Sequence, residues 1–452
     1  MAKVTKIYIC SNCGTRYSKW LGKCSNCGEW NTIEEQIINK TDVKSNNLLT
    51  ISPKLIQEIN YDNFERISLP SDELNRILGG GLTRGSIILL AGEPGIGKTT
   101  LLMQELMKIK DFTVLYVSGE ESLGQLKYRS ERLGRPNSQF YLFHELSLPI
   151  IIQAIEEVVP DFVVIDSIQS ISDPNLSGFT GSLQQIRECT SRLQEIAKVK
   201  NIPIFIIGHI TKEGYIAGPK ALEHIVDTVM HFEGDKNYGY RVLRVIKNRF
   251  GPAPELAIFE MTQDGLKEIN NISEYLLETY KPDTPGSSIA VLMEGNRPIL
   301  VEVQALVSYS PYGTPQRSSI GYDPHRLGMI LAVLEKRLDL RVNNRDIFVN
   351  VTGGLRIYDP AIDSAVVAAI LSSFNDKTLP HLLALSAEIG LNGELRSVSQ
   401  LQKRIQEASK LGFKQLITAN IKEKSFKNES FNSSINLKFI NNISELAQVL
   451  FF

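Results

Sequence analysis

Four continuous apolar runs organise the middle of the chain. They are GSIILLAG, FTVLYVSG, DFVVIDS and IPIFIIGHI. Because hydrophobic residues follow one another without polar alternation, the runs predict parallel strands that are covered on both faces. The segment between the last two carries an apolar stripe at helical spacing, formed by Leu183, Ile186, Thr190, Leu193 and Ala197. The pattern predicts an α/β domain with a parallel sheet over about residues 56–266.

The pattern changes after about residue 270, where we predict an α+β domain. Two strands joined at Gly295-Asn296 are predicted in SSIAVLMEGNRPILVEVQALVSYS. Helices are predicted in HRLGMILAVLEKRL and AIDSAVVAAILSSF. The polar segment 36–55 has weak periodicity and is typical of a linker. We therefore expect a cysteine-rich segment at 1–35, this linker, the α/β domain at 56–266 and the α+β domain at 270–452.

Composition and charge narrow the class of protein. A chain of 452 residues is too long for one ordinary core, which favours two or three domains. The sequence has no apolar run of the roughly 20 residues that a membrane helix needs, and its first residues lack the layout of a signal peptide. We therefore expect a cytoplasmic protein without a membrane partner. The net charge of −1 means that any nucleic acid must meet local basic patches or an assembly that concentrates them.

Four of the five cysteines lie within the first 27 residues. Cys10 and Cys13 form one CxxC pair, and Cys24 and Cys27 form another after a gap of ten residues. One tight turn directs two thiolates at one ion, so two such turns complete a tetrahedron. In a reducing compartment this clustering predicts structural Zn²⁺, because redox dithiols seldom occur as matched pairs.

Both tryptophans of the chain, Trp20 and Trp30, flank the second CxxC pair. Two interpretations are open. The indole rings pack on the metal-binding turn, or they stack on a nucleic-acid base or a protein partner.

A phosphate-binding loop lies between a predicted strand and a predicted helix. GEPGIGKT fits the pattern GxxxxGK[ST] in the context that the motif requires. Its glycines let backbone N–H groups approach phosphates, and the helix N-terminus adds a positive dipole. Lys98 is expected to reach the β and γ phosphates and Thr99 to hold Mg²⁺. The expected nucleotide-binding residues here are Gly92, Glu93, Pro94, Gly95, Ile96, Gly97, Lys98, Thr99 and Thr100.

Acidic and imidazole side chains end three of the predicted strands. Asp166 ends DFVVIDS, where its carboxylate is expected to orient the Mg²⁺ shell. Glu120 follows VLYVS and is expected to polarise the attacking water, with Glu121 as the competing candidate. His209 ends IPIFIIGHI, either as a γ-phosphate sensor or as an ordinary strand-end histidine.

Taken together, the motifs resemble the bacterial RadA/Sms family of DNA repair proteins. The order of phosphate loop, Glu, Asp and sensor strand is similar to that of RecA-type ATPases. The fuller pattern adds the four-Cys finger, HITKEGYIAGPKALEHIVDTVMHFEGD and KNRFG, so the resemblance covers essentially the whole chain. It implies a hexameric, ATP- and Mg²⁺-dependent DNA motor with a RecA-like core. Such a motor binds single-stranded and branched DNA, promotes branch migration and works with a RecA-type recombinase.

The basic segment KNRFG takes its expected role from this resemblance. In RecA-like rings the nucleotide lies between subunits, which implies that Lys247 and Arg249 act on the γ-phosphate held by a neighbouring copy. Lys247 and Arg249 are two residues apart, so on a strand they share a face. With Lys98 and Glu120 they complete the expected catalytic set. The alternative is a basic strand that contacts DNA or solvent.

Two polar, glycine-bearing loops are candidates for DNA contact. SDPNLSGFTGS follows Asp166, and TKEGYIAGPK follows the sensor strand. Both belong at the carboxyl ends of parallel strands, where ligands bind. Candidate contacts are Lys212 and Lys220 for phosphates, and Phe179 and Tyr215 for stacking. The alternative is that both loops are ordinary connectors.

The last block contains RIYDPAIDSAVVAAIL and ALSAEIGLNGELRSVSQLQKRIQEASKLGF. These stretches resemble the proteolytic domain of Lon proteases but lack its catalytic pair. Ala361 stands where that family has a nucleophilic Ser, and Gln402 stands where it has a Lys. Lys403 is rotated by about 100° on a helix, and Ser364 comes three residues late. We expect a proteolytically inactive domain that serves as a scaffold for hexamer assembly and DNA contact.

Scattered cations in the same block are either a DNA-binding patch or a solvated surface. They are Lys403, Arg404, Lys410, Lys414, Arg317, His325 and Arg326. Two rival functions also remain at this stage. One is an ATP-dependent Lon-like protease, and the other is a nucleotide-gated DNA-binding switch without motor activity.

Overall fold

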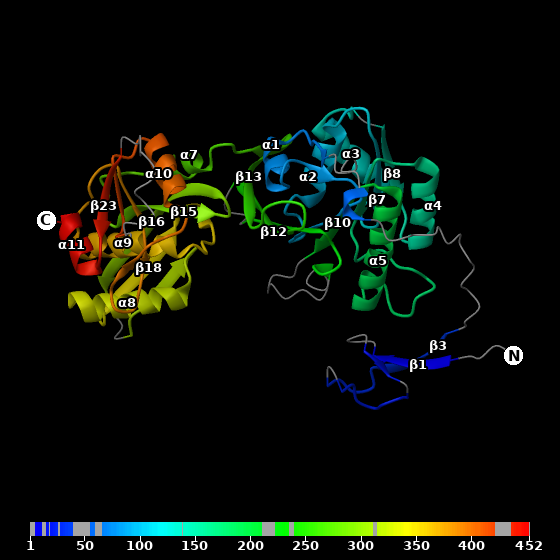
Figure 1. The fold of residues 1–452 in the computed structure, drawn as a ribbon, viewed down its shortest axis with the longest axis horizontal. Helices are drawn as coiled ribbons and strands as arrows, with labels where there is room; N and C mark the ends of the chain where they lie inside the picture. Colours follow the sequence, from blue (N-terminus) through cyan, green and yellow to red (C-terminus); the bar gives the residue numbers. More distant parts are fainter. Residues whose placement is uncertain are drawn as a thin grey trace. The chain divides into compact units, whose positions relative to one another are not determined.

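A computed structural model describes most of the chain. The described residues are 5–10, 15–17, 19–25, 28–38, 55–58, 66–137, 139–209, 222–234, 239–310, 314–420 and 435–451. The ribbon in Figure 1 follows the sequence from the N-terminus to the C-terminus. The fold divides into two compact units, and each is assembled from three segments of the chain. The first consists of Met1–Glu233, Val242–Ala253 and Met261–Lys267. The second consists of Gly234–Arg241, Pro254–Glu260 and Glu268–Phe452.

The cysteine-rich segment forms a small antiparallel sheet. Its strands are β1 (Thr5–Cys10), β2 (Arg16–Tyr17) and β3 (Ile33–Ile38), in the order β2-β1-β3. Cys10 pairs with Ile33 across β1 and β3, which brings the start of the first CxxC pair beside β3. Cys10, Cys24 and Ile33 form one buried cluster, so residues from both CxxC pairs share the core of this segment.

The α/β region is built on a nine-stranded sheet in the order β14-β13-β12-β11-β6-β10-β9-β7-β8. The six strands from β11 to β8 run parallel to their neighbours, which confirms the predicted parallel sheet. They are β6 (Ile87–Gly92), β7 (Thr113–Ser118), β8 (Gln139–His144), β9 (Phe162–Asp166), β10 (Ile204–His209) and β11 (Thr228–Glu233). The sheet continues with β12 (Tyr240–Asn248), which pairs antiparallel with β11, and with β13 (Glu255–Thr262) and β14 (Gly265–Glu268).

Helices connect the parallel strands and cover them. They are α1 (Asp72–Ile77), α2 (Lys98–Lys108), α3 (Leu123–Leu133), α4 (Leu148–Val158) and α5 (Leu183–Lys200). The α5 helix begins where the Ser182 hydroxyl accepts a hydrogen bond from the backbone N–H of Gln185. Its predicted apolar stripe packs with α4 against alternate residues of the strands. Short elements here are η1 (Ile56–Glu58), β4 (Arg66–Ile67) and β5 (Leu82–Thr83).

The second unit carries a seven-stranded mixed sheet in the order β17-β18-β16-β15-β19-β22-β23. Its strands are β15 (Ser287–Glu294), β16 (Arg297–Tyr309), β17 (Arg317–Ile320), β18 (Arg345–Val351), β19 (Leu383–Ser386), β22 (Gln415–Ala419) and β23 (Asn436–Ile440). The two predicted strands form the antiparallel pair β15–β16, in which Glu294 faces Arg297 across the turn. A separate two-stranded sheet joins β20 (Glu388–Ile389) to β21 (Leu395–Arg396).

Helix α9 (Asp363–Asn375) is the central helix of this unit. Its residues from Asp363 to Ser372 are all buried, so the helix is covered on every side rather than on one face only. The other helices are α7 (Ile272–Leu277), α8 (Pro324–Leu338), α10 (Leu401–Lys410) and α11 (Ile443–Phe451). Two 3₁₀ turns, η3 (Thr352–Gly354) and η4 (Pro360–Ile362), precede α9.

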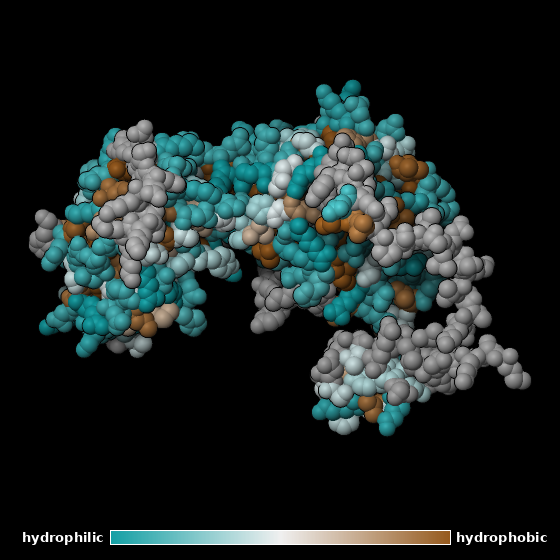
Figure 2. Space-filling view, viewed as in Figure 1, coloured by the Kyte–Doolittle hydropathy of each residue, from teal (hydrophilic) through white to brown (hydrophobic). Residues whose placement is uncertain are grey.

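The surface of each unit is mostly hydrophilic on the face shown in Figure 2, where hydrophobic residues gather only in small groups. Within the part of the chain that the structure describes, no helix is long and apolar enough to cross a membrane.

Candidate active site

The phosphate loop forms the turn between β6 and α2. Gly95 (φ 76°) and Gly97 (φ 117°) adopt left-handed backbone conformations that L side chains rarely take. A Cβ atom on Gly92 would lie 2.6 Å from the carbonyl oxygen of Phe232, so only glycine lets β6 end this close to β11. The loop therefore turns tightly into the N-terminus of α2, where the positive end of the helix dipole favours an anion.

Lys98 is buried and held across its own loop. Its Nζ atom donates hydrogen bonds to the carbonyl oxygens of Gly92 (2.8 Å) and Glu93 (2.9 Å). Burial lowers the pKa of Lys98 to about 8, and the carboxylates of Asp166 and Glu120 act in the opposite direction. A buried ammonium beside a glycine turn fits the phosphates of a nucleotide, because a polyanion would compensate for the lost hydration of the charge.

Thr99 and Asp166 meet beside Lys98. The Thr99 hydroxyl donates to Asp166 Oδ2 at 2.7 Å, and the Tyr116 hydroxyl donates to the same oxygen at 2.6 Å. Burial raises the pKa of Asp166, whereas these two hydrogen bonds lower it. A hydroxyl and a carboxylate are oxygen donors of the kind that Mg²⁺ prefers. Thr99 and Asp166 would thus hold Mg²⁺, which would neutralise charge on the phosphates.

Tyr116 was missed by the sequence analysis. It lies on β7, the strand next to β9, and is fully buried. Burial raises its pKa well above the ordinary value, so the phenol remains a hydrogen-bond donor to Asp166. A tyrosine inside the otherwise aliphatic run VLYVS was the available signal, because a buried phenol needs a polar partner.

His209 links Lys98 to Glu120. Its Nδ1 atom lies 3.2 Å from Lys98 Nζ, and its Nε2 atom lies 2.8 Å from Glu120 Oε1. An ammonium only donates and a carboxylate only accepts. Both contacts are satisfied together by a neutral ring that carries its proton on Nε2. Glu120 also accepts a hydrogen bond from the Ser167 hydroxyl, and the bond from His209 is the main reason why the pKa of Glu120 is lowered.

The competing acid, Glu121, faces another way. It forms an ion pair with Arg129 of α3, and its backbone N–H donates to the Ser118 hydroxyl. Glu120 is therefore the acid of this pair that lies beside the phosphate loop, and the geometry favours it as the residue that orients water.

Lys247 and Arg249 both turn toward the segment 223–227. Lys247 Nζ donates to the carbonyl oxygens of Glu223 and Val226, and Arg249 pairs with buried Asp227 at 3.0 Å. Arg249 lies just beyond the end of β12 at Asn248. The pKa of Lys247 is lowered, mainly by burial and to a smaller extent by the positive charge of Arg249. The two cations share a side of the chain, and their role at a neighbour's phosphate remains a prediction.

The loop after β9 presents an aromatic side chain to solvent. Gln185 of α5 holds this loop through Nε2, which donates to the carbonyl oxygens of Asp173, Leu176 and Gly178. Phe179, within the loop, is 91% exposed. The second candidate loop, with Lys212, Tyr215 and Lys220, lies outside the described residues.

The cysteine-rich segment fits a thiolate-bound metal as far as it is described. The Cys10 and Cys24 side chains are fully buried in one cluster. Gly28, with φ at 76°, donates its N–H to the Cys24 carbonyl and closes the second turn. Two buried thiols from different CxxC pairs suit Zn²⁺, which prefers thiolate sulfur. Cys13 and Cys27, the other predicted ligands, lie outside the described residues.

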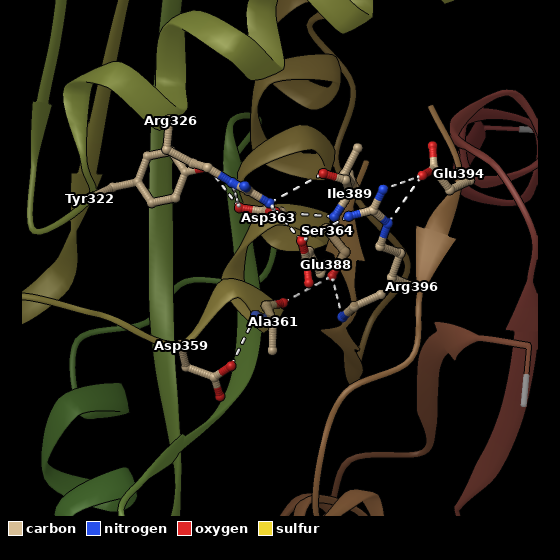
Figure 3. A network of polar contacts seen from close by, with 11 residues as sticks. Tyr322, Arg326, Asp359, Ala361, Asp363, Ser364, Glu388, Ile389, Glu394 and Arg396 are labelled. Atoms are coloured by element: carbon tan, nitrogen blue, oxygen red, sulfur yellow. Dashed lines mark hydrogen bonds and ion pairs between the residues drawn. The ribbon is translucent and has the colours of Figure 1, made fainter. Parts of the chain in front are cut away.

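The region that corresponds to a Lon catalytic centre is filled by structural contacts (Figure 3). Ala361 is buried in η4, and its N–H donates to Asp359 Oδ1 at 3.0 Å. Ser364 is fully buried, donates to the Ala361 carbonyl and accepts a bond from the Ala387 N–H. Ser364 is therefore a structural hydroxyl, which agrees with the prediction of an inactive protease domain.

Arg404 does not belong to a surface patch, so that interpretation was wrong for this residue, whereas Arg326 is partly exposed. Arg404 is 1% exposed and pairs with Asp359 at 2.7 Å, because it lies on the inner face of α10 with Leu401 and Ile405. Arg326 pairs with fully buried Asp363. Gln402 and Lys403 are exposed on α10, and Lys403 contacts the Asn296 carbonyl at 3.4 Å.

Three separate stretches of the chain match known protein families. Residues 8–35 match the family described as rubredoxin metal binding domain, residues 57–215 match the AAA domain, and residues 335–452 match the Lon protease (S16) C-terminal proteolytic domain. These matches confirm the predicted fold class of a metal-binding segment, a P-loop ATPase core and a Lon-like domain.

Curated relatives are similar over nearly the full chain. DNA repair protein RadA of Bacillus subtilis is 46% identical over 425 residues, which cover 92% of this chain and 93% of the relative. DNA repair protein RadA of Streptococcus pyogenes serotype M6 is 45% identical over 418 residues, with 91% and 92% covered. A solved KaiC-like protein from Pyrococcus horikoshii is 20% identical with a TM-score of 0.39, over 46% of this chain and 99% of that chain.

Proposed function

This chain belongs to the RadA family of DNA repair proteins, and on that premise we propose that it is a DNA-dependent ATPase that acts as a motor in recombinational repair. The link from Lys98 through His209 to Glu120 carries the proposal. It holds the residue expected to bind phosphates and the carboxylate expected to orient water on either side of one imidazole ring. The AAA domain match supports ATP hydrolysis, and the relatives' name supports DNA repair.

Within one chain, the proposed chemistry depends on five side chains. Lys98 binds the β and γ phosphates, while Thr99 and Asp166 hold Mg²⁺, which supplies charge neutralisation on the phosphates. Glu120 accepts a hydrogen bond from the attacking water and orients it toward the γ-phosphate. His209 positions Glu120 and contacts Lys98, so it is placed to transmit the presence of phosphate at Lys98 to the water-orienting acid.

The remaining catalytic charge comes from a neighbouring copy in the proposed homo-hexamer. Lys247 and Arg249 lie two residues apart, so both side chains can contact the oxygens of one γ-phosphate. Cations supplied from a neighbour stabilise negative charge in the transition state. When the ring dissociates, the active site loses these cations. Arg249 then exchanges its ion pair with Asp227 for the neighbour's phosphate.

DNA contact is assigned to the loops at the carboxyl ends of the parallel strands. The 172–182 loop begins six residues after Asp166, a proposed Mg²⁺ ligand, and its exposed Phe179 is suited to stack on a base. Because Asp166 ends β9 and this loop follows it, a conformational change at the nucleotide can be transmitted to the bound DNA along β9. We propose that this motor moves single-stranded and branched DNA and promotes branch migration, together with a RecA-type recombinase.

ATP turnover with and without single-stranded DNA tests this function. We expect single-stranded DNA to raise turnover severalfold, and we expect displacement of a labelled strand from branched DNA that requires ATP. The oligomeric state is measured on the same preparation, with a hexamer expected. DNA binding that leaves turnover unchanged and displaces no strand would replace the motor with a nucleotide-gated switch. Degradation of casein by the purified protein would instead support the alternative function of an ATP-dependent Lon-like protease.

The Glu120→Gln variant separates the two candidate acids. Because a neutral amide cannot accept a proton or attract water as a carboxylate does, we expect turnover to fall at least about 10²-fold. Glu121→Gln is the matched control, since it changes the adjacent acid that pairs with Arg129, and it should retain most activity. Steady-state ATP hydrolysis with nucleotide binding measured in parallel checks both. Equal losses in the two variants would contradict the assignment.

A further inference from the structure

The two tryptophans of the chain form an exposed aromatic pair in the cysteine-rich segment. Trp20 is 56% exposed and Trp30 is 67% exposed. Both rings lie beside Gly22, because a Cβ atom there would be 3.6 Å from the Trp20 ring and 3.9 Å from the Trp30 ring. The Trp20 indole N–H donates to the Ile33 carbonyl at 3.0 Å. This bond fixes the polar edge of Trp20 inward and leaves much of its ring to solvent.

Lysines accompany the aromatic pair. Lys23 is the antiparallel bridge partner of Trp30, and its Nζ atom lies 5.5 Å from the centre of the Trp30 ring. Lys19, next to Trp20, is exposed as well, and so are the carboxylates of Glu29 and Glu34. Two flat apolar surfaces thus lie next to two positive charges.

The chemistry of this pair fits single-stranded nucleic acid better than a protein. A stable protein interface needs about 800 Å² on each partner with a continuous apolar centre. Among the described residues of the cysteine-rich segment, the large exposed hydrophobic side chains are Trp20 and Trp30. Two indole rings offer the area of one or two bases, and neighbouring lysines can meet the phosphates between them.

We propose that Trp20 and Trp30, with Lys19 and Lys23, form a stacking site for single-stranded DNA on the metal-binding segment. This site resolves the choice left by the sequence in favour of stacking on a base. The inference rests on the proposed function in one respect, since it adds a second contact for the DNA on which the motor acts. It requires neither ATP nor the 172–182 loop.

Intrinsic fluorescence tests the site in the full-length protein, because the chain has only these two tryptophans. Oligo-dT is titrated into zinc-loaded protein while emission is recorded, and binding is followed in parallel by anisotropy of the labelled strand. We expect saturable quenching of the emission. An oligonucleotide of equal length whose central residues are abasic keeps the phosphates but removes the bases, so it should bind without quenching.

Variants locate the effect. In Trp30→Ala, the remaining Trp20 reports on the site, and its quenching midpoint should shift about 5-fold to 100-fold to higher DNA concentration. Trp30→Phe retains an aromatic face and should restore most of the affinity. Tyr128→Ala, which removes an exposed aromatic ring from α3, should leave quenching intact. Zinc content and thermal unfolding show whether each variant folds.

The outcomes separate this inference from the proposed function. Oligo-dT that binds by anisotropy but leaves tryptophan emission unchanged overturns the stacking site, whether or not DNA stimulates ATP turnover. A shift of emission that occurs only with a RecA-type recombinase, in the absence of free DNA, overturns it in favour of a protein partner. Quenching without DNA-stimulated turnover supports the stacking site and refutes the motor.

Discussion

Replacing Lys98 with alanine will abolish ATP hydrolysis, with a loss of at least about 10³-fold, while the fold remains. The buried ammonium is the cation that the chain itself places within its phosphate loop, beside the Gly92 and Glu93 carbonyls. Without it, the phosphates lose a charge-assisted contact and His209 loses its partner at Nδ1. Burial lowers the pKa of Lys98 to about 8, so the amine still carries most of its charge near neutral pH, and the substitution removes that charge from the loop.

Steady-state ATP turnover at saturating Mg²⁺ measures this effect. Lys108→Ala is the matched control, because Lys108 ends the same helix and is exposed. That variant should hydrolyse ATP at the wild-type rate. Circular dichroism and thermal unfolding confirm that both variants fold. Normal turnover in folded Lys98→Ala protein would rule out the role assigned to the phosphate loop.

Arg249→Ala will lower ATP turnover by about 10³-fold or more, if the guanidinium acts on a neighbour's phosphate. Mixing this variant with Lys98→Ala will restore activity, because some seams join an intact phosphate loop to an intact Arg249. In randomly mixed rings one seam in four has that pairing, so about a quarter of the wild-type turnover should return. ATP hydrolysis across mixing ratios, after subunit exchange, measures the recovery.

Folding controls matter for Arg249 because it pairs with Asp227, which is buried. Arg249→Ala leaves that carboxylate without its ion pair and is expected to lower thermal stability. Arg249→Lys keeps a positive charge beside Asp227 and separates stability from catalysis. Arg192→Ala, an exposed arginine on α5, is the matched control. Mixtures that recover nothing, together with a monomer that hydrolyses ATP at full speed, would refute catalysis between subunits.

Local sequence determined much of the candidate site. The phosphate loop is contiguous, and the left-handed conformations of Gly95 and Gly97 are the kind that its glycines permit. The aliphatic runs also indicated the parallel strands, since strands that are buried on both faces need no polar alternation. The absence of a protease nucleophile at Ala361 could also be predicted from the sequence, because one residue type decides whether that chemistry exists.

Contacts between strands that are distant in sequence were beyond local inference. Tyr116 reaches Asp166 because β7 lies next to β9, and periodicity does not encode strand order. Glu120 and Glu121 are neighbours in a loop, and only the folded backbone turns one toward His209 and the other toward Arg129. The burial of Arg404 could not be predicted locally either, because it depends on an ion pair with Asp359, which is distant in sequence.

The sequence by itself thus determined which chemistry the chain carries: a phosphate loop, paired thiols for a metal, and a protease-like domain without its nucleophile. These features depend on residue type at short spacing, where covalent geometry fixes the result. Only the tertiary structure decided which acid faces the phosphate loop, which arginines are structural, and that Trp20 and Trp30 face solvent. Those outcomes depend on packing between distant segments, because a side chain's partner is set by the whole fold rather than by its neighbours in the chain.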